Sequence, residues 1–217
     1  MKLQKTTFKP GTRVRLKDFD TRETSGLTKE ESYPIAEGDT HLIGDLAYKL
    51  YAENSRALLI VLQGMDTAGK DGAIRHIMRC VNAQATEVIP FKKPSSEELD
   101  HDFLWRVHKK VPATGNIGIF NRSHYEDVLV VRVHDLVPRG EWQSRYQRIN
   151  EFEKLLTGSG VTILKFFLHI SKEEQRERLQ ARLDNPNKRW KFSKGDLAKR
   201  ALWNDYQTAY IDALTKC

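Results

Sequence analysis

Cysteine and long apolar runs are both scarce in this sequence of 217 residues. Its two cysteines, Cys80 and Cys217, are too few for a disulfide framework or a cysteine-based zinc site, and they fit a reducing compartment. The seven histidines show no metal-ligand spacing, which argues further against zinc. No apolar run approaches the roughly 20 residues of a membrane helix, and the N-terminus holds no apolar signal segment. We therefore expect a soluble, cytoplasmic protein with no membrane partner.

Positive charge is in excess. Lysine and arginine total 36 against 29 aspartates and glutamates, which gives a formal net charge of +7. Such a surplus indicates a polyanionic partner, which could be nucleic acid, an anionic membrane, or a phosphate-rich small molecule or polymer. No motif that reads DNA or RNA is present, so we expect no nucleic-acid partner. The length suits one hydrophobic core, and we expect residues 1–217 to form a single domain.

The stretch from Leu58 to Ile74 carries the most specific pattern in the chain. Ala57 to Leu62 form a short apolar run, typical of a strand buried on both faces. The next segment, Gly64 to Lys70, satisfies G-x-x-x-x-G-K, and a helical pattern begins at Ala73. In this order the glycines let backbone N–H groups turn toward an anion, while the helix N-terminus and the lysine add positive charge. We prefer this phosphate-binding loop to an ordinary strand-turn-helix joint, and assign to it Gly64, Met65, Asp66, Thr67, Ala68, Gly69, Lys70, Asp71 and Gly72.

Two carboxylates distinguish this loop. Asp71 stands where a Ser or Thr would hold Mg²⁺ in the usual loop, and Asp66 lies inside the loop itself. A carboxylate beside phosphates is repelled unless a divalent cation lies between them. Asp66 is therefore predicted to bind Mg²⁺, with Mn²⁺ as the alternative ion, directly or through water. The competing interpretation is that Asp66 caps the following helix or pairs with Lys70.

Apolar strands alternate with helical patterns, which predicts a parallel α/β sheet covered on both faces. We expect strands near residues 57–62, 86–91, 117–120 and 161–170, and helices near 44–54, 73–81, 95–110, 123–136, 141–157, 173–183 and 193–217. Capping boxes are expected at Ser95 or Ser96 with Glu98, and at Ser123 with Glu126. Residues 1–40 contain Pro10, Gly11, Gly26, Pro34 and Gly38 and are expected to form a mostly irregular arm, with a short strand at 13–16. Polar residues at the strand ends should converge on one cleft.

Residues 171–200 form a basic region. Between Arg178 and Arg200 there are eight basic and two acidic residues. Two helices joined by a basic, proline-broken loop predict a lid that closes over phosphates and excludes water. A solvated basic helical hairpin is the alternative. Because a phosphate-binding loop is already predicted, we favour the lid.

Three motifs closely resemble the type 2 polyphosphate kinases, and most of all their class III branch. They read GMDTAGKDG at 64–72, IFNRSHYEDVLVVRVH at 119–134 and RLDNPNKRWKFS at 182–193. The resemblance implies a P-loop kinase fold of the thymidylate kinase type, a three-layer α/β/α structure with a helical lid. It further implies Mg²⁺-dependent, reversible phosphoryl transfer from inorganic polyphosphate to AMP and ADP, and a homo-oligomeric assembly, dimer or tetramer.

The resemblance also implies roles for particular residues. Asp66 and Lys70 act at the loop, with Mg²⁺ on Asp66, and Arg122 contacts phosphate. Many relatives carry Asp where this chain has Asn121, so Asp127 is a second candidate for metal binding and catalysis. The lid positions that line the polyphosphate path are Arg178, Arg182, Lys188 and Arg189.

The nucleotide side of the cleft is predicted less specifically. Phe91 is a candidate for stacking on the base, although a phenylalanine at a strand end is often simply core. The other candidates for nucleotide binding are Lys92 and Arg106 for the α-phosphate, together with Asn121 and Arg132. Adenine nucleotides are the expected acceptors, with guanine nucleotides as the alternative.

Two other functions compete with this interpretation. An ATP-dependent nucleoside monophosphate kinase of the thymidylate kinase type would use the same loop for ATP. A non-catalytic polyanion binder would also have a basic charge, and its binding would depend steeply on salt. A catalytic triad of Ser123, His124 and Asp127 is set aside, because close neighbours along one helix cannot easily form the required relay.

Overall fold

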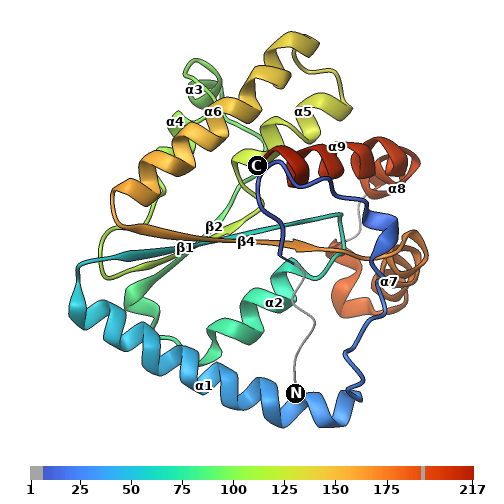
Figure 1. The fold of residues 1–217 in the computed structure, drawn as a ribbon. Helices are drawn as coiled ribbons and strands as arrows, with labels where there is room; N and C mark the ends of the chain where they lie inside the picture. The colour runs from blue at the N-terminus through green and yellow to red at the C-terminus, as the bar shows by residue number, and fades with distance from the viewer. Residues whose placement is uncertain (1–6, 192–193) are drawn as a thin grey trace.

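The computed structural model describes residues 7–191 and 194–217, which are arranged in layers around a parallel sheet (Figure 1). The strands are β1 Ala57–Gly64, β2 Thr86–Pro90, β3 Ile117–Asn121 and β4 Val161–Leu168. In the described part of the chain the strand order is β2-β3-β1-β4, and each neighbouring pair is parallel. The predicted strands and the predicted parallel α/β fold are therefore confirmed.

Helices cover both faces of this sheet (Figure 1). The α-helices are α1 Lys29–Glu53, α2 Lys70–Ile77, α3 Ser96–Leu99, α4 Trp105–His108, α5 Val130–Val133, α6 Arg139–Gly158, α7 Lys172–Asp184, α8 Lys194–Ala201 and α9 Trp203–Lys216. Short 3₁₀ turns are η1 Leu16–Asp18, η2 Met78–Cys80, η3 Ala83–Ala85, η4 His124–Asp127 and η5 Pro186–Lys191. No helix within the described ranges is long and apolar enough to cross a membrane.

The apolar side chains of the strands divide between the two faces. Leu62 and Ile119 pack with Ile74 of α2, on the side that α1 and α2 cover. Val61 belongs to the larger cluster on the other side, which includes Ile149 of α6 together with side chains of α9. The three-layer arrangement predicted for a P-loop kinase is thus present, with the sheet as its middle layer.

The strand register brings the functional ends of the strands to one edge. Asn121 at the end of β3 pairs with Leu62 of β1 and with Pro90 of β2. On the other side of β1, Gly64 pairs with Leu168 of β4. The loop after β1 and the residues after β3 therefore leave the sheet side by side, where α/β proteins bind their ligands.

The N-terminal arm is more helical than predicted. An irregular course was expected over residues 1–40, but α1 begins within this range. Thr28 and Glu31 form a capping box in which Thr28 Oγ1 accepts the Glu31 N–H at 3.2 Å. The prediction was wrong because it gave Pro34 and Gly38 weight as helix breakers. Pro34 lies inside the helix, in its second turn, where it removes one backbone hydrogen bond without ending the helix.

The helix predicted over residues 95–110 is instead two short helices. Ser95 and Glu98 do form the predicted capping box at the start of α3. The chain then leaves the helix, and Asp102 accepts a hydrogen bond from the N–H of Leu104 at 2.9 Å. A side-chain bond of this kind competes with helical hydrogen bonds, and α4 is a separate turn.

The capping box predicted at Ser123 and Glu126 does not form. Ser123 Oγ accepts the N–H of Tyr125 at 3.2 Å, and a 3₁₀ turn follows it. The Glu126 carboxylate is drawn instead to Arg122, at 3.2 Å. The long helix expected here is reduced to α5, and the glutamate belongs to the site rather than to a helix start.

Two further segments differ from the prediction. Residues 13–16 are not a strand, although Val14 and Leu16 are buried in the core. The helix predicted from residue 193 onward is divided near Leu202 into α8 and α9. Ser193, the expected start, lies outside the described residues, as does the end of the third sequence motif.

Two glycines of α1 make a matched pair for a stability test. A Cβ at Gly44 would lie 2.5 Å from the carbonyl oxygen of Cys80, whereas a Cβ at Gly38 would meet nothing within 4 Å. Gly44→Ala should lower the free energy of unfolding by about 1–3 kcal/mol through overpacking. Gly38→Ala should raise it by about 0.5–1 kcal/mol through helix propensity. Urea unfolding measures both, and equal effects of the two substitutions would contradict the packing described here.

Candidate functional site

The loop between β1 and α2 has the backbone that its glycines predict. Gly64 and Gly69 have φ angles of 152° and 106°, and Thr67 between them has φ 68°. A Cβ at Gly64 would also lie 2.8 Å from the Leu168 carbonyl oxygen, because β4 approaches closely at this point. These conformations favour glycine for steric reasons. The predicted strand, tight turn and helix are therefore all formed, and α2 begins at Lys70.

Lys70 points back into the loop. Its Nζ donates to the carbonyl oxygens of Gly64 at 2.7 Å and Met65 at 3.1 Å, and the residue is only 8% exposed. Burial lowers the pKa of Lys70 to about 8, helped by Arg122 and opposed by nearby carboxylates, of which Asp66 is the strongest. Among the described residues the ammonium donates to carbonyl oxygens and forms no ion pair at contact distance, so a phosphate could supply a direct anionic partner.

Phosphate binding should consequently depend on pH. Anionic phosphate favours charged Lys70, so affinity is greatest below pH 8 and falls as pH rises through about 8. The free energy of unfolding changes with pH in the opposite direction. Because the pKa of Lys70 is lower in the folded protein than in the unfolded chain, folding stability rises with pH between about 8 and 10.5. Calorimetric titration of tripolyphosphate at pH 7 and pH 9 measures the first effect. Lys70→Met should flatten this pH dependence, and an unchanged profile in that variant would contradict the assignment.

Asp66 is the carboxylate around which cationic side chains gather. Arg122 donates to Asp66 Oδ1, and Lys199 of α8 donates to Asp66 Oδ2 at 2.9 Å. Burial alone would raise the pKa of Asp66, but Arg122 and then Lys199 outweigh it and hold the pKa below its ordinary value. The N-cap of α2 is Gly69, so Asp66 does not cap this helix. Asp66 is thus kept ionised at the mouth of the loop.

Arg122 links the loop to the end of β3. Its backbone N–H donates to the Leu62 carbonyl at 3.0 Å, and its φ of 64° turns the chain sharply after the strand. The guanidinium reaches Asp66 and, at 3.2 Å, the Glu126 carboxylate. The neighbouring Asn121 donates to Asp71 Oδ1 at 2.8 Å. The ends of β1 and β3 therefore form one polar cluster, as the sequence predicted.

Asp127 is held by a different partner. It lies 3.0 Å from Arg145 of α6, and this arginine also pairs with Glu141 at 2.6 Å. Burial raises the pKa of Asp127 to about 6, although Arg145 and Arg106 act in the opposite direction. Asp127 therefore lies beside α6 and pairs with Arg145. The residue of the second sequence motif that pairs with Asp66 is Arg122.

The residues predicted to bind nucleotide lie in two places. Phe91 is buried edge-to-face against Phe120, with ring centroids 4.8 Å apart. Arg106 lies over the Phe91 ring at 5.1 Å and donates to Glu98 at 2.9 Å and to the Lys92 carbonyl at 2.8 Å. Phe91, Glu98 and Arg106 line a groove of about 340 Å³ between β2 and α4. Phe91 is thus a core residue, which was the alternative to base stacking, although it also lines the groove.

Arg132 is placed apart from the other predicted residues. It donates to Asp212 of α9 at 2.6 Å and to the Tyr146 hydroxyl at 3.4 Å. Its guanidinium also stacks over the Trp142 ring at 4.6 Å. These contacts join α5 to α6 and α9, so Arg132 has a structural role in the packing of these helices.

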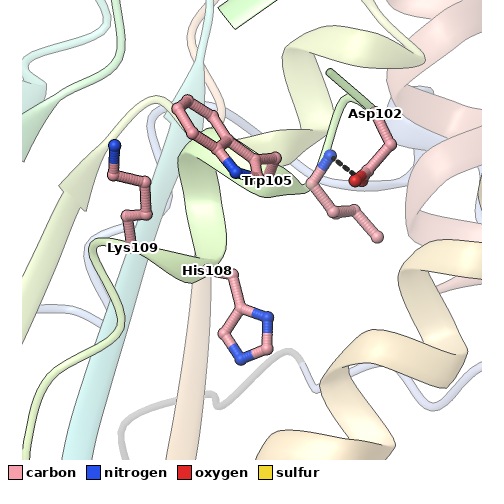
Figure 2. Close-up of a pocket in the computed structure, with 5 residues that line it drawn as sticks. Asp102, Trp105, His108 and Lys109 are labelled. Carbon is pink, nitrogen blue, oxygen red and sulfur yellow. Dashed lines mark hydrogen bonds between the residues drawn. The ribbon is translucent and has the colours of Figure 1, made fainter.

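The sequence did not single out Trp105, which lies next to the predicted nucleotide residues. Its ring stacks on His101 at 4.0 Å, and Lys109 Nζ lies 3.9 Å from the ring centroid. Trp105, Lys109, Asp102 and His108 line a pocket of about 380 Å³. Figure 2 shows Trp105 and Lys109 on one side of this pocket. A tryptophan in a short amphipathic segment is usually core, so no sequence signal marked this one.

The basic region contacts the loop from α7 and α8. Arg178 donates to the Thr67 carbonyl at 3.0 Å, and its Nε donates to Glu174 at 2.6 Å. Gln175, fully buried, donates to the Asp66 carbonyl at 3.0 Å. Of the predicted lid residues, Arg178 therefore reaches the loop directly. Gln175 and Lys199 also reach it but were not among the predicted site residues.

The other predicted lid residues face elsewhere. Arg182 lies 3.8 Å from Asp196 of α8, which joins the two helices of this region. Arg189 donates to the Leu183 carbonyl at 2.7 Å. Arg189 and Lys188 belong to η5 and are exposed to solvent. The predicted lid residues are therefore divided, with Arg178 at the loop and Arg182, Lys188 and Arg189 away from it.

Comparison with known proteins adds independent information. A family model described as polyphosphate kinase 2 (PPK2) matches residues 29–217. An AMP/ADP-polyphosphate phosphotransferase of Meiothermus ruber is 51% identical over 214 residues, which cover 98% of this chain and 80% of that protein. An ADP-polyphosphate phosphotransferase of Rhodopseudomonas palustris is 46% identical over 201 residues, 87% of this chain and 70% of that protein.

A solved structure shares the arrangement of the whole fold. The crystal structure of polyphosphate kinase 2 from Arthrobacter aurescens TC1 matches with a TM-score of 0.90 and 45% sequence identity. The match covers 94% of this chain and 74% of that one. The layered sheet, the loop after β1 and the helices around it are therefore similar to those of a solved protein over nearly the whole chain.

Proposed function

Because this chain belongs to the polyphosphate kinase 2 family, we propose that it transfers phosphoryl groups reversibly between inorganic polyphosphate and the nucleotides AMP and ADP. One observation of the structure supports this most strongly. Lys70, Arg122 and Lys199, from three separate elements, surround the same loop carboxylate, Asp66. Such a concentration of positive charge suits a chain of phosphates, each carrying roughly one negative charge.

The loop is proposed to hold the terminal phosphates of the polymer. The backbone N–H groups of residues 64–72 and the ammonium of Lys70 would face the phosphate oxygens. We propose that Arg178, which donates to the Thr67 carbonyl, binds the next phosphates, and that Arg182, Lys188 and Arg189 bind phosphates further along the polymer. Phosphoryl transfer needs positioning, charge neutralisation and exclusion of water more than covalent chemistry, and these residues supply the first two.

Arg122 is the side chain proposed to neutralise charge on the transferred phosphoryl group. It lies at the junction of β1 and β3, between the loop and the side of the cleft where the acceptor would enter. Its guanidinium is held on two sides by Asp66 and Glu126, so its orientation is fixed before substrate binds. A preorganised donor of this kind does not have to be oriented during the reaction, which is the general advantage of such sites.

Asp66 fits a divalent cation such as Mg²⁺ or Mn²⁺. Its carboxylate is ionised, and carboxylate oxygen is a ligand that these hard cations prefer. Within the described residues no three His, Cys, Asp or Glu side chains gather into a metal site, so the remaining ligands would be substrate oxygens and water. That mode of binding is typical of Mg²⁺ with phosphates, whose charge the ion neutralises. Asp127, held by Arg145, remains the second proposed ligand.

The acceptor nucleotide is proposed to bind on the β2 side of the cleft. Arg106 lines the groove next to Phe91 and donates to the carbonyl of Lys92, and Asn121 lies at the adjacent end of β3. We assign the α-phosphate to the two cations, and the base, adenine or guanine, to the aromatic side of the groove. Arg132 would take part only if its bond to Asp212 opens. We also propose that the protein assembles as a dimer or tetramer.

The function is tested by luciferase-detected ATP formation from AMP and from ADP, with Mg²⁺ and polyphosphate but no added ATP. Polyphosphate-dependent ATP from both acceptors is the expected result, and it corresponds to the class III branch. ATP from ADP alone would keep polyphosphate as donor but reject the AMP reaction. Phosphorylation that appears only when ATP is the donor would contradict the proposal and identify an ATP-dependent nucleoside monophosphate kinase.

A further inference from the structure

Lys199 occupies a particular position on the loop carboxylate. Its Nζ lies 2.9 Å from Asp66 Oδ2, while Arg122 binds the other oxygen, Oδ1. The Asp66 side chain is only 16% exposed, and that of Lys199 is 37% exposed. Lys199 comes from α8, 133 residues further along the chain. The Lys199 ammonium group therefore already occupies the Asp66 oxygen, Oδ2, that a bound cation would need.

This contact ties α8 to the loop. The next residue, Arg200, donates to the Lys172 carbonyl at 2.5 Å and to Gln175 Oε1 at 3.3 Å, so it binds α8 to α7 rather than to the loop. Gln175 in turn donates to the Asp66 carbonyl. Lys199 is thus the direct side-chain link from α8 to Asp66, while Arg200 and Gln175 provide an indirect one.

An ammonium group and a divalent cation cannot share one carboxylate oxygen at contact distance. A cation bound to Asp66 Oδ2 would lie about 2–2.5 Å from that oxygen. It would stand within a few ångströms of Nζ, where like charges repel strongly, above all in a partly buried site. Lys199 must then leave before the cation can enter.

We propose that Lys199 and the divalent cation compete for Asp66, so that Lys199 latches α8 to the loop in the metal-free protein and cation binding releases this latch. The inference rests on the proposed function in one respect, the assignment of Asp66 as a cation ligand. Release frees an ammonium group at the mouth of the loop, where the phosphates of the polymer would become its new partners. Binding of the cation and phosphates at the loop is thereby coupled to the position of α8.

Mn²⁺ binding in the absence of nucleotide and polyphosphate tests the competition directly, with electron paramagnetic resonance as the readout. Lys199→Met should bind Mn²⁺ roughly five times more tightly than the wild type, the size expected for a partly exposed ion pair. Lys199→Arg should stay near the wild-type affinity, since it keeps the charge and a donor. Lys172→Met is the matched control, because it removes an exposed lysine of the same region that does not touch Asp66.

Hydrogen exchange of α8 gives a second readout that does not depend on activity. In the wild type, Mn²⁺ should increase exchange over residues 194–201; in Lys199→Met exchange should already be high, and Mn²⁺ should change it little. Equal Mn²⁺ affinity in Lys199→Met and the wild type would overturn the latch, even if the enzyme makes ATP from polyphosphate. Conversely, competition without polyphosphate-dependent ATP would keep the latch and reject the proposed function. Circular dichroism confirms that the variants fold.

Discussion

Replacing Lys70 by methionine should lower kcat for polyphosphate-dependent ATP formation by a factor of about 10²–10³, the usual effect of removing a preorganised charge-stabilising donor. The Lys70 ammonium is buried and donates to the carbonyl oxygens of Gly64 and Met65. Methionine has nearly the same length but no charge. The folded structure should survive, because the substitution removes a buried charge rather than a packed apolar group.

Two comparisons keep this result interpretable. Lys154→Met, on the exposed side of α6, removes the same charge far along the chain from the loop and should leave kcat within a factor of two. Lys70→Arg keeps the charge but adds bulk at a position that is 8% exposed, and it should recover only part of the activity. If Lys70→Met retained wild-type kcat while its thermal unfolding was unchanged, the loop would not be the site of transfer.

Replacing Arg122 by methionine should have a similarly large effect, with a loss in kcat of about 10²–10³ and a smaller change in KM for polyphosphate. Arg122 is proposed to act on the transferred group, so its contribution belongs mainly to the transition state. The variant also removes the strongest influence that lowers the pKa of Asp66, and that pKa should rise. Steady-state kinetics with varied polyphosphate separates the two parameters.

Arg148→Met is the matched control for Arg122. Arg148 is an exposed arginine of α6, and its loss should change neither kcat nor KM by more than a factor of two. Arg122→Lys keeps one charge but cannot bridge Asp66 and Glu126 with a planar guanidinium, so it should rescue little. An increase in KM alone in Arg122→Met would instead assign the arginine to substrate binding.

The parts of the fold that the sequence predicts correctly are those determined by neighbouring residues. Ala57–Leu62 is an uninterrupted apolar run, and Gly64 and Gly69 adopt the positive φ angles that their spacing suggested. Strand, turn and helix could be placed because each depends on a few consecutive residues. The convergence of Asn121 and Arg122 on the loop followed from the general geometry of parallel sheets.

The errors arose where two local signals competed. Thr28 and Glu31 form a capping box that the prediction did not use, because Pro34 and Gly38 suggested an irregular chain. The reverse happened at Ser123: its spacing to Glu126 suggested a capping box, but the carboxylate is more strongly attracted to Arg122. Local patterns cannot show that a charged group has a stronger partner elsewhere in the fold.

The rest of the site depends on contacts between distant parts of the chain. Lys199 meets Asp66 across 133 residues, and Gln175 reaches the Asp66 carbonyl across 109. The sequence marked a basic region but not which of its cations would face the loop. Arg132 is the opposite case: it was predicted to bind nucleotide, but its side chain contacts Asp212 and Trp142 instead. Only the packing of α7, α8 and α9 distinguishes these residues.

The most direct test of the central claim is diffraction at the manganese edge from crystals that contain tripolyphosphate and Mn²⁺. The account predicts an anomalous peak at Asp66, phosphates against residues 64–72 and Lys70, and Lys199 displaced from Asp66 Oδ2. Manganese bound away from Asp66, with no tripolyphosphate against residues 64–72, would contradict this assignment.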